Sequence, residues 1–238
     1  WPRAPQHETL QDEVIGSLAV LPLHNLTGDP AQDYYVDGLQ ELLITELSQL
    51  PDVRVTSRQS TKRYRDSHLP ATDIAKELGV DALVEGSLLR EGRKVEVSIQ
   101  LIDGRSDVHL WADRYARDTS YVLDLVSDMA RAIGTEIVSA TAPPGSQMPD
   151  HGLTGPVDPR AIDAYALGLM HMDQLTSGGI RLAIEQLQEA VNIEPKFALA
   201  WGQLALAHAL HGMQGFAHPR EAMEKGRAAA NRAVETDD

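Results

Sequence analysis

Residues 81–118 carry the pattern of three consecutive antiparallel strands, and this stretch constrains the fold most. Polar and apolar side chains alternate in its middle segment, through Lys94, Val95, Glu96, Val97, Ser98, Ile99, Gln100 and Leu101. A side-chain period of two is what a sheet with one buried face requires. Glycine follows an acidic residue at Glu91-Gly92 and Asp103-Gly104, where tight turns are expected. The stretch predicts a sheet but specifies no chemistry.

The residues before this stretch predict a strand–helix–strand unit. Leu18–Leu21 is a short apolar run ended by Pro22, as in a strand buried on both faces. An amphipathic helix is predicted over Asp29–Leu50, with Asp29 as N-cap and Pro30 in the first helical position. Val53–Val55 reads as a second strand, so we expect a parallel, right-handed crossover. Further helices are predicted over residues 72–78, ended by Gly79, and over 120–141.

A change of composition predicts the domain boundary. Residues 142–159 contain five prolines and three glycines without periodicity, which is typical of a linker. We therefore expect a lead-in over 1–16, an α/β domain over 17–141, a linker over 142–158 and a helical domain over 159–238. The fold class predicted is α+β/α multidomain: a mixed sheet of about five strands, followed by an all-α part.

The last part of the chain predicts four alanine-rich helices. Small residues recur at helical spacing, and Pro195 forces a turn between two pairs. This is the tetratricopeptide pattern, whose repeat is about 34 residues, although both units are irregular. About three units are the usual minimum for a stable repeat array. Two units must therefore lean on the α/β domain, dimerise, or have lost their successors.

Charge and composition exclude several classes of function. Lys plus Arg number 21 and Asp plus Glu 35, giving −14, so direct nucleic-acid contact is not expected. The chain has no cysteine, which excludes disulfides, thiolate nucleophiles and cysteine-based zinc sites. No apolar run reaches the ~18–20 residues of a membrane helix.

Seven motifs occur in a fixed order: Ser17–Pro22, Asn25–Pro30, Asp37–Leu39, Glu77–Val80, Val84–Leu88, Gln100–Asp103 and His109–Tyr115. Together they resemble the TolB amino-terminal-like domain, which in its family is typically followed by tetratricopeptide repeats. The resemblance covers roughly residues 17–238. It implies an output domain before Trp1, such as a CadC/ToxR-type winged helix-turn-helix, a nucleotide cyclase or a kinase.

The resemblance also implies a membrane anchor upstream of Trp1. It places the chain in the extracytoplasmic (periplasmic) part of a bacterial membrane protein, with a cytoplasmic location as the alternative. It implies no catalytic residue, so we expect no enzyme activity and no cofactor. The predicted function is a sensing or scaffolding module that binds protein or peptide partners. The alternatives are a structural homodimerisation module and an enzyme that uses acidic or histidine residues.

Partner contacts are predicted on two surfaces. If no bulge intervenes, alternation places Trp111 and Tyr115 on the polar face of the sheet, with Glu96, Ser98 and Gln100. The concave side of the helix pairs would contribute Tyr165, Gln203 and His208. The alternative for the sheet face is that the amino-terminal tail or the repeats simply cover it.

Three polar clusters carry competing interpretations. His171, His208 and His211 could bind a metal ion, although packing or solvent exposure is favoured. Four carboxylates recur on one face of the first helix, at Asp29, Asp33, Asp37 and Glu41. They suit acid–base chemistry or, preferably, a solvated face that matches the helix dipole. A basic cluster follows the second strand: Arg54, Arg58, Lys62, Arg63 and Arg65. It could dock an acidic partner or a membrane, but a solvated loop is favoured.

Overall fold

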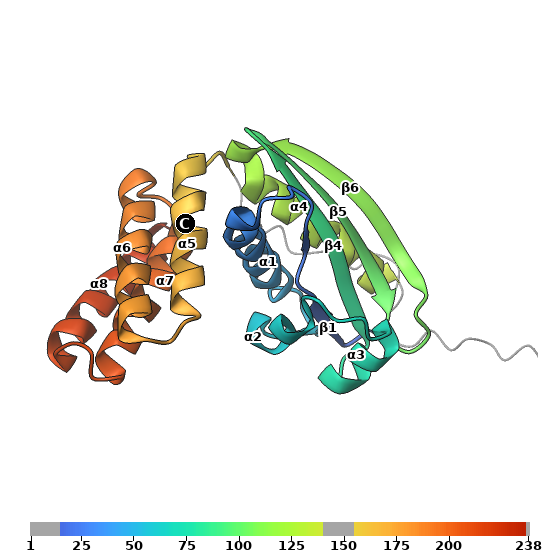
Figure 1. Cartoon of the computed structure of the whole chain (residues 1–238), viewed down its shortest axis with the longest axis horizontal. Coiled ribbons are helices and arrows are strands. Elements are labelled where there is room, and N and C mark those ends of the chain that lie inside the picture. Colours follow the sequence, from blue (N-terminus) through green and yellow to red (C-terminus); the bar gives the residue numbers. More distant parts are fainter. Residues whose placement is uncertain (1–14, 140–154, 237–238) are drawn as a thin grey trace, which may run out of the picture.

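The computed structural model describes residues 15–139 and 155–236, which form a mixed sheet with helices and a carboxyl-terminal group of four helices (Figure 1). The predicted lead-in and linker lie almost entirely outside the described residues, and the predicted domain boundaries stay a prediction. Residues 15–139 are called the sheet unit below, and α5–α8 the helical unit.

The sheet has six strands in the order β3-β1-β4-β5-β6, with β2 paired to β4. The strands are β1 (Ser17–Val20), β2 (His24–Asn25), β3 (Arg54–Val55), β4 (Ala82–Glu91), β5 (Lys94–Asp103) and β6 (His109–Asp118). As predicted, β1 and β3 are parallel, and β4, β5 and β6 are antiparallel. The two-residue strand β2 was not predicted, because two residues carry no alternation.

Helices cover both faces of the sheet. The helices are α1 (Asp33–Leu47), α2 (Arg58–Thr61), α3 (Ala71–Leu78) and α4 (Val122–Ser139), with short 3-10 turns at Pro30–Gln32, Lys62–Tyr64 and Thr119–Tyr121. The main core packs between the sheet, α1 and α4, and a smaller cluster packs α3 against Ala19, Leu83 and Ile102 on the other face. The run from Ser17 to Leu21 is therefore buried on both faces, as predicted.

Local signals fix several element ends. The Asp29 carboxylate accepts a hydrogen bond from the Ala31 amide, with Pro30 in the first helical position. Gly79 ends α3 at φ +66°, a left-handed conformation that costs glycine little. Thr176 caps α6 by accepting a hydrogen bond from the Gly179 amide at 3.0 Å.

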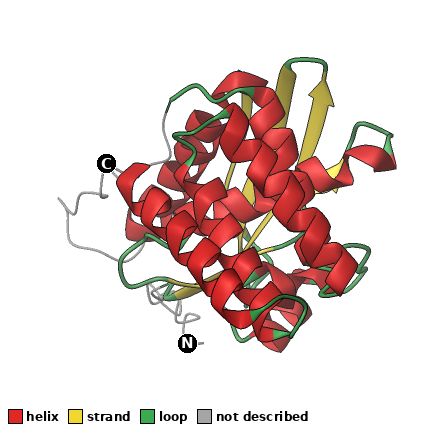
Figure 2. Cartoon of the chain, turned by 90° about the vertical axis from the view of Figure 1, so that its left-hand side faces the viewer, coloured by secondary structure: helices red, strands yellow, loops and turns green. Residues whose placement is uncertain are grey.

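The helical unit consists of α5 (Pro159–Met172), α6 (Ser177–Ile193), α7 (Ala198–Met213) and α8 (Pro219–Thr236). Helices that follow each other along the chain pack against each other. Viewed from the side of the helical unit, its helices lie in front of the sheet (Figure 2). At Gly168, an added Cβ would lie 2.6 Å from Leu187 Cγ, so the lack of a side chain lets α5 approach α6 closely. No helix within the described ranges is long and apolar enough to cross a membrane.

We expect Gly168→Ala to lower the free energy of unfolding by about 1–3 kcal/mol, because the new methyl group overlaps Leu187. Gly202→Ala is the matched control, since an added Cβ in the middle of α7 meets no atom within 4 Å. This control should gain up to about 1 kcal/mol from helix propensity. Urea unfolding of both variants gives the two values, and equal effects would contradict the packing assignment.

Candidate functional site

The sheet unit and the helical unit meet where α1 packs against α5 (Figure 1). A Cβ added at Gly38 would lie 2.6 Å from the Ala166 Cβ, so the two helices are in close contact. One buried apolar cluster continues from the sheet through Leu39 and Leu43 into Tyr165 and Leu204 of the helical unit. Of the three solutions expected for a two-unit helical array, the structure shows the helices leaning on the sheet unit.

Arg58 lies at one end of this junction, with only 9% of its side chain exposed. Its Nε donates to Glu41 Oε2 at 3.1 Å, and its Nη2 donates to Asp173 Oδ2 at 2.6 Å. Asp37 Oδ2 lies 3.8 Å from Nη1, and Asp37 Oδ1 pairs with Arg65. Burial by itself lowers the pKa of Arg58, but the neighbouring carboxylates, Asp173 foremost, raise it above its ordinary value.

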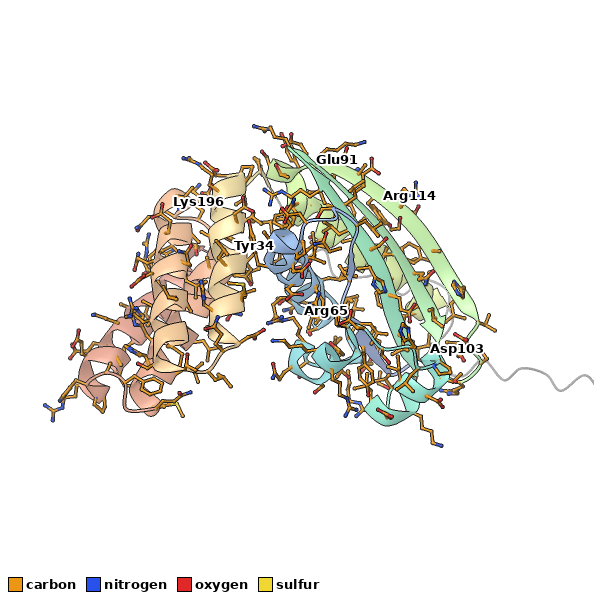
Figure 3. All side chains as sticks on the ribbon, in the orientation of Figure 1. Tyr34, Arg65, Glu91, Asp103, Arg114 and Lys196 are labelled. Carbon is orange, nitrogen blue, oxygen red and sulfur yellow. The ribbon has the colours of Figure 1, made fainter. Side chains whose placement is uncertain are left out.

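A second ion pair joins the units at the other end of α5. Arg90 on β4 donates to both oxygens of Asp163, at 2.6 and 3.0 Å. The Tyr34 hydroxyl donates to the same carboxylate at 3.3 Å, and Figure 3 shows Tyr34 between α1 and α5. The Arg90 guanidinium also lies 4.1 Å from the centre of the Tyr35 ring. Burial raises the pKa of Tyr35, whose hydroxyl has no hydrogen-bond partner among the described residues.

These contacts correct two predictions about charge. The acidic face of α1 and the basic cluster after β3 were both expected to be solvated, yet Asp37 and Glu41 bind Arg58, which also binds Asp173. The signal was present in the sequence as two complementary clusters some twenty residues apart. Asp163 and Asp173 gave no such signal, because isolated carboxylates on a helix are usually solvent-exposed.

A groove of about 210 Å³ opens at the junction, between α1–α2 and α5–α7. Its lining includes Glu41, Arg58, Leu169, Asp173, Gln203 and Leu206. The Gln203 Oε1 atom is buried, and no hydrogen-bond partner for it lies within the described part of the chain. Of the predicted partner-contacting residues, Gln203 is therefore the one that the structure places in a groove between the two units.

A larger hollow, of about 490 Å³, lies over the polar face of β4–β6. Its lining includes His24, Glu85, Ser87, Ser98, Gln100 and Arg114. Arg114 Nε donates to Ser98 Oγ at 3.2 Å, and Gln100 Nε2 donates to Glu85 Oε2 at 3.3 Å. The predicted polar face exists, but its β6 members are the even-numbered residues.

Trp111 and Tyr115 were expected on that polar face, and this prediction is wrong. The register pairs Tyr115 with Val97 and Trp111 with Leu101, so both rings lie on the apolar face and pack against the main core. Burial, with the nearby Asp113 carboxylate, raises the pKa of Tyr115 to about 12.

Tyr165 and His208 are also less accessible than expected. Tyr165 is 1% exposed, with its ring centre 5.0 Å from that of Phe197, so it belongs to the core rather than to a concave surface. His208 is partly buried and lies near Gly226 of α8. Within the part of the chain that the structure describes, no three His, Asp or Glu side chains are grouped for a metal ion.

Comparison with known proteins gives a family match over part of the chain. Residues 13–130 match the HilA/YgeH-like transcriptional regulator second domain. This HilA/YgeH-like segment contains the whole sheet and the first half of α4, and it ends before the helical unit. It therefore includes Arg58 and Arg90, whereas their partners Asp173 and Asp163 lie outside it.

A longer relative covers both units. A protein of Rhizobium meliloti (strain 1021) named "Putative adenylate cyclase 3" is 31% identical over 191 residues, which is 80% of this chain and 32% of the relative. The chain thus spans about a third of that protein.

Solved structures similar to this chain include lipoprotein GNA1162 from Neisseria meningitidis and TolB from Acinetobacter baumannii. The first has a TM-score of 0.38 and 15% identity, covering 52% of this chain and 99% of that one. The second has a TM-score of 0.35 and 17% identity, covering 54% of this chain and 28% of that one. The finer resemblance, to a TolB amino-terminal-like domain with tetratricopeptide repeats, stays a prediction.

Replacing Arg58 tests the junction of the HilA/YgeH-like segment with the helical unit. We expect Arg58→Met to lower the free energy of unfolding by about 3 kcal/mol, because it leaves three half-buried carboxylates without their shared cation. Arg181→Met is the control, since Arg181 and Glu185 form an exposed pair and should contribute less than about 0.5 kcal/mol. Denaturant unfolding measures both, and a loss no larger than that of the control would refute the structural role.

The partial burial of His208 predicts a loss of stability in acid. Burial, with Lys225 and His211 nearby, lowers its pKa in the folded state. The unfolded chain therefore binds more protons, and this contribution to stability falls as the pH drops below the unfolded value of about 6.5. We expect His208→Gln to reduce the fall in melting temperature between pH 7 and pH 5. His24→Gln, an exposed substitution on β2, serves as the control; equal behaviour of the two would exclude His208 as the cause.

Proposed function

We propose that this chain is a non-catalytic regulatory module that binds a protein or peptide partner and relays that binding to an output domain. The output domain would be a transcription regulator, a cyclase or a kinase in the longer protein. The match of residues 13–130 to a transcriptional regulator domain supports a regulatory role, as does the relative named as a cyclase. In this proposal the helical unit acts as two tetratricopeptide-type hairpins.

The observation that carries the proposal is the apolar core shared across α1 and α5. A partner that contacts the helical unit can influence the sheet unit only if the two units are mechanically joined. The two units are joined at several points: by the Gly38–Ala166 contact and by the largely buried ion pairs of Arg58 and Arg90. A flexible tether would separate the binding event from the output domain.

Exchange into the Rhizobium meliloti relative tests the relay. The matching 191 residues of that protein would be replaced by this chain, and cyclic AMP would be measured in cells that lack other cyclases. We expect Arg58→Met and the groove variant Leu206→Asp to change cyclic AMP several-fold at equal protein level. Arg181→Met, on the exposed face of α6, should leave it unchanged.

An output that is indifferent to all three substitutions would contradict the relay. The alternative, a structural dimerisation module, predicts a different result. In that case the isolated chain is dimeric by light scattering, and cyclic AMP follows the dimer fraction rather than the state of the junction.

A further inference from the structure

We propose that the groove between α1–α2 and α5–α7 is an anchor site for one long basic side chain, lysine or arginine, of a partner protein. The inference rests on the proposed function, because it names the chemistry that the partner presents. It concerns the groove lined by Glu41, Asp173 and Gln203, and not the larger hollow over the sheet.

The size and the walls of the groove suit a single side chain with an apolar stem. Its volume, about 210 Å³, matches one long side chain rather than an extended peptide. Leu169, Met172 and Leu206 supply apolar surface, and Leu206 is 47% exposed although it is a large apolar residue. Lysine and arginine bury their methylene stems along such surfaces while the charged end reaches polar groups.

The polar residues that line the groove have acceptor atoms left over from the contacts of the fold. Gln203 lines the groove, and its Oε1 atom is buried with no hydrogen-bond partner among the described residues. Glu41 binds Arg58 through Oε2, and Asp173 binds Arg58 and Lys62 through Oδ2. These contacts use one oxygen of each carboxylate. Glu41 Oε1 and Asp173 Oδ1 therefore receive no hydrogen bond from Arg58 or Lys62. An ammonium or guanidinium group offers only donors, so it complements such a set.

Charge favours a cation over an anion. The lining carries the carboxylates of Glu41 and Asp173 against the guanidinium of Arg58, and the whole chain has a net charge of −14. An acidic side chain would meet two carboxylates that already share their cation, which disfavours it. Lys62 is the competing cation: it binds Asp173 at 3.1 Å from outside the lining, and 44% of its side chain is exposed.

The test titrates the whole chain with two small probes. Nα-acetyl-L-lysine methylamide carries the ammonium group, and Nα-acetyl-L-norleucine methylamide has a similar stem without it. Methyl and side-chain amide NMR signals of Leu169, Leu206 and Gln203 report binding. We expect saturable shifts of these signals, with the lysine probe binding at least about fivefold more tightly, as a hydrogen-bonded charged group allows.

Three variants sharpen the test. Gln203→Leu should weaken the binding of the lysine probe about fivefold or more and leave the binding of the norleucine probe nearly unchanged. Lys62→Met should strengthen the binding of the lysine probe, because it removes the ammonium group that pairs with Asp173. Gln188→Leu, at an exposed position on α6 where Gln188 donates to Asn192, is the matched control and should alter neither probe.

Equal affinity for the two probes would overturn the proposal, as would the absence of saturable shifts at the groove. Tighter binding of the lysine probe by the Lys62→Met variant is a result that a purely apolar groove would not give. The outcomes are separable from those of the relay. If Leu206→Asp changes cyclic AMP in the exchanged protein but lysine does not bind, the anchor chemistry is wrong and the relay stands. If lysine binds and the output does not respond, the site stands and the relay fails.

Discussion

The contact of α1 with α5 is the interaction on which the rest of the structure depends. Ten of the fifteen residues of α1 are buried, which a helix packed on one side cannot achieve. One side of α1 covers the sheet, and Gly38 brings the other side against Ala166. Through this contact the apolar cluster of the sheet unit continues into α5–α8, so the two units form one core.

The ion pairs at this junction act on geometry more than on net stability. Burying Arg58 and Arg90 costs solvation that their carboxylates only partly restore. Their placement near the two ends of α5 nevertheless fixes how that helix lies across α1, because a displaced helix would separate Asp163 or Asp173 from its arginine. The apolar contact thus provides the attraction, and the ion pairs select one arrangement.

This arrangement also decides which surfaces are open to a partner. Tyr165 lies in the core, and Trp111 and Tyr115 are partly buried against it, although the sequence indicated all three as contact residues. What stays accessible is the polar face of β4–β6 and the groove beside Gln203. Of these two surfaces, the groove is the one with walls from both units, so an occupant there would contact the helical unit and the sheet unit at once.

The sequence by itself determined the long strands and helices, but not the short elements β2 and α2. Alternation over residues 94–101 specified β5 and its buried face, and caps such as Asp29 and Gly79 specified where elements begin or end. These features depend on residues that are close along the chain, where side-chain period and backbone preference act directly.

Only the tertiary structure decided the face of β6, the pairing of the charged clusters and the burial of Tyr165. The face of β6 depends on the connection from Asp103 to His109, with Asp107 at φ +59° and a register shift at Leu101/Ile102, and a change of one residue there inverts every side chain. Asp173 and Asp163, which bind Arg58 and Arg90 from α5 and its carboxyl end, lie 115 and 73 residues away in the sequence. Such contacts follow from how separate elements pack, which local periodicity does not encode.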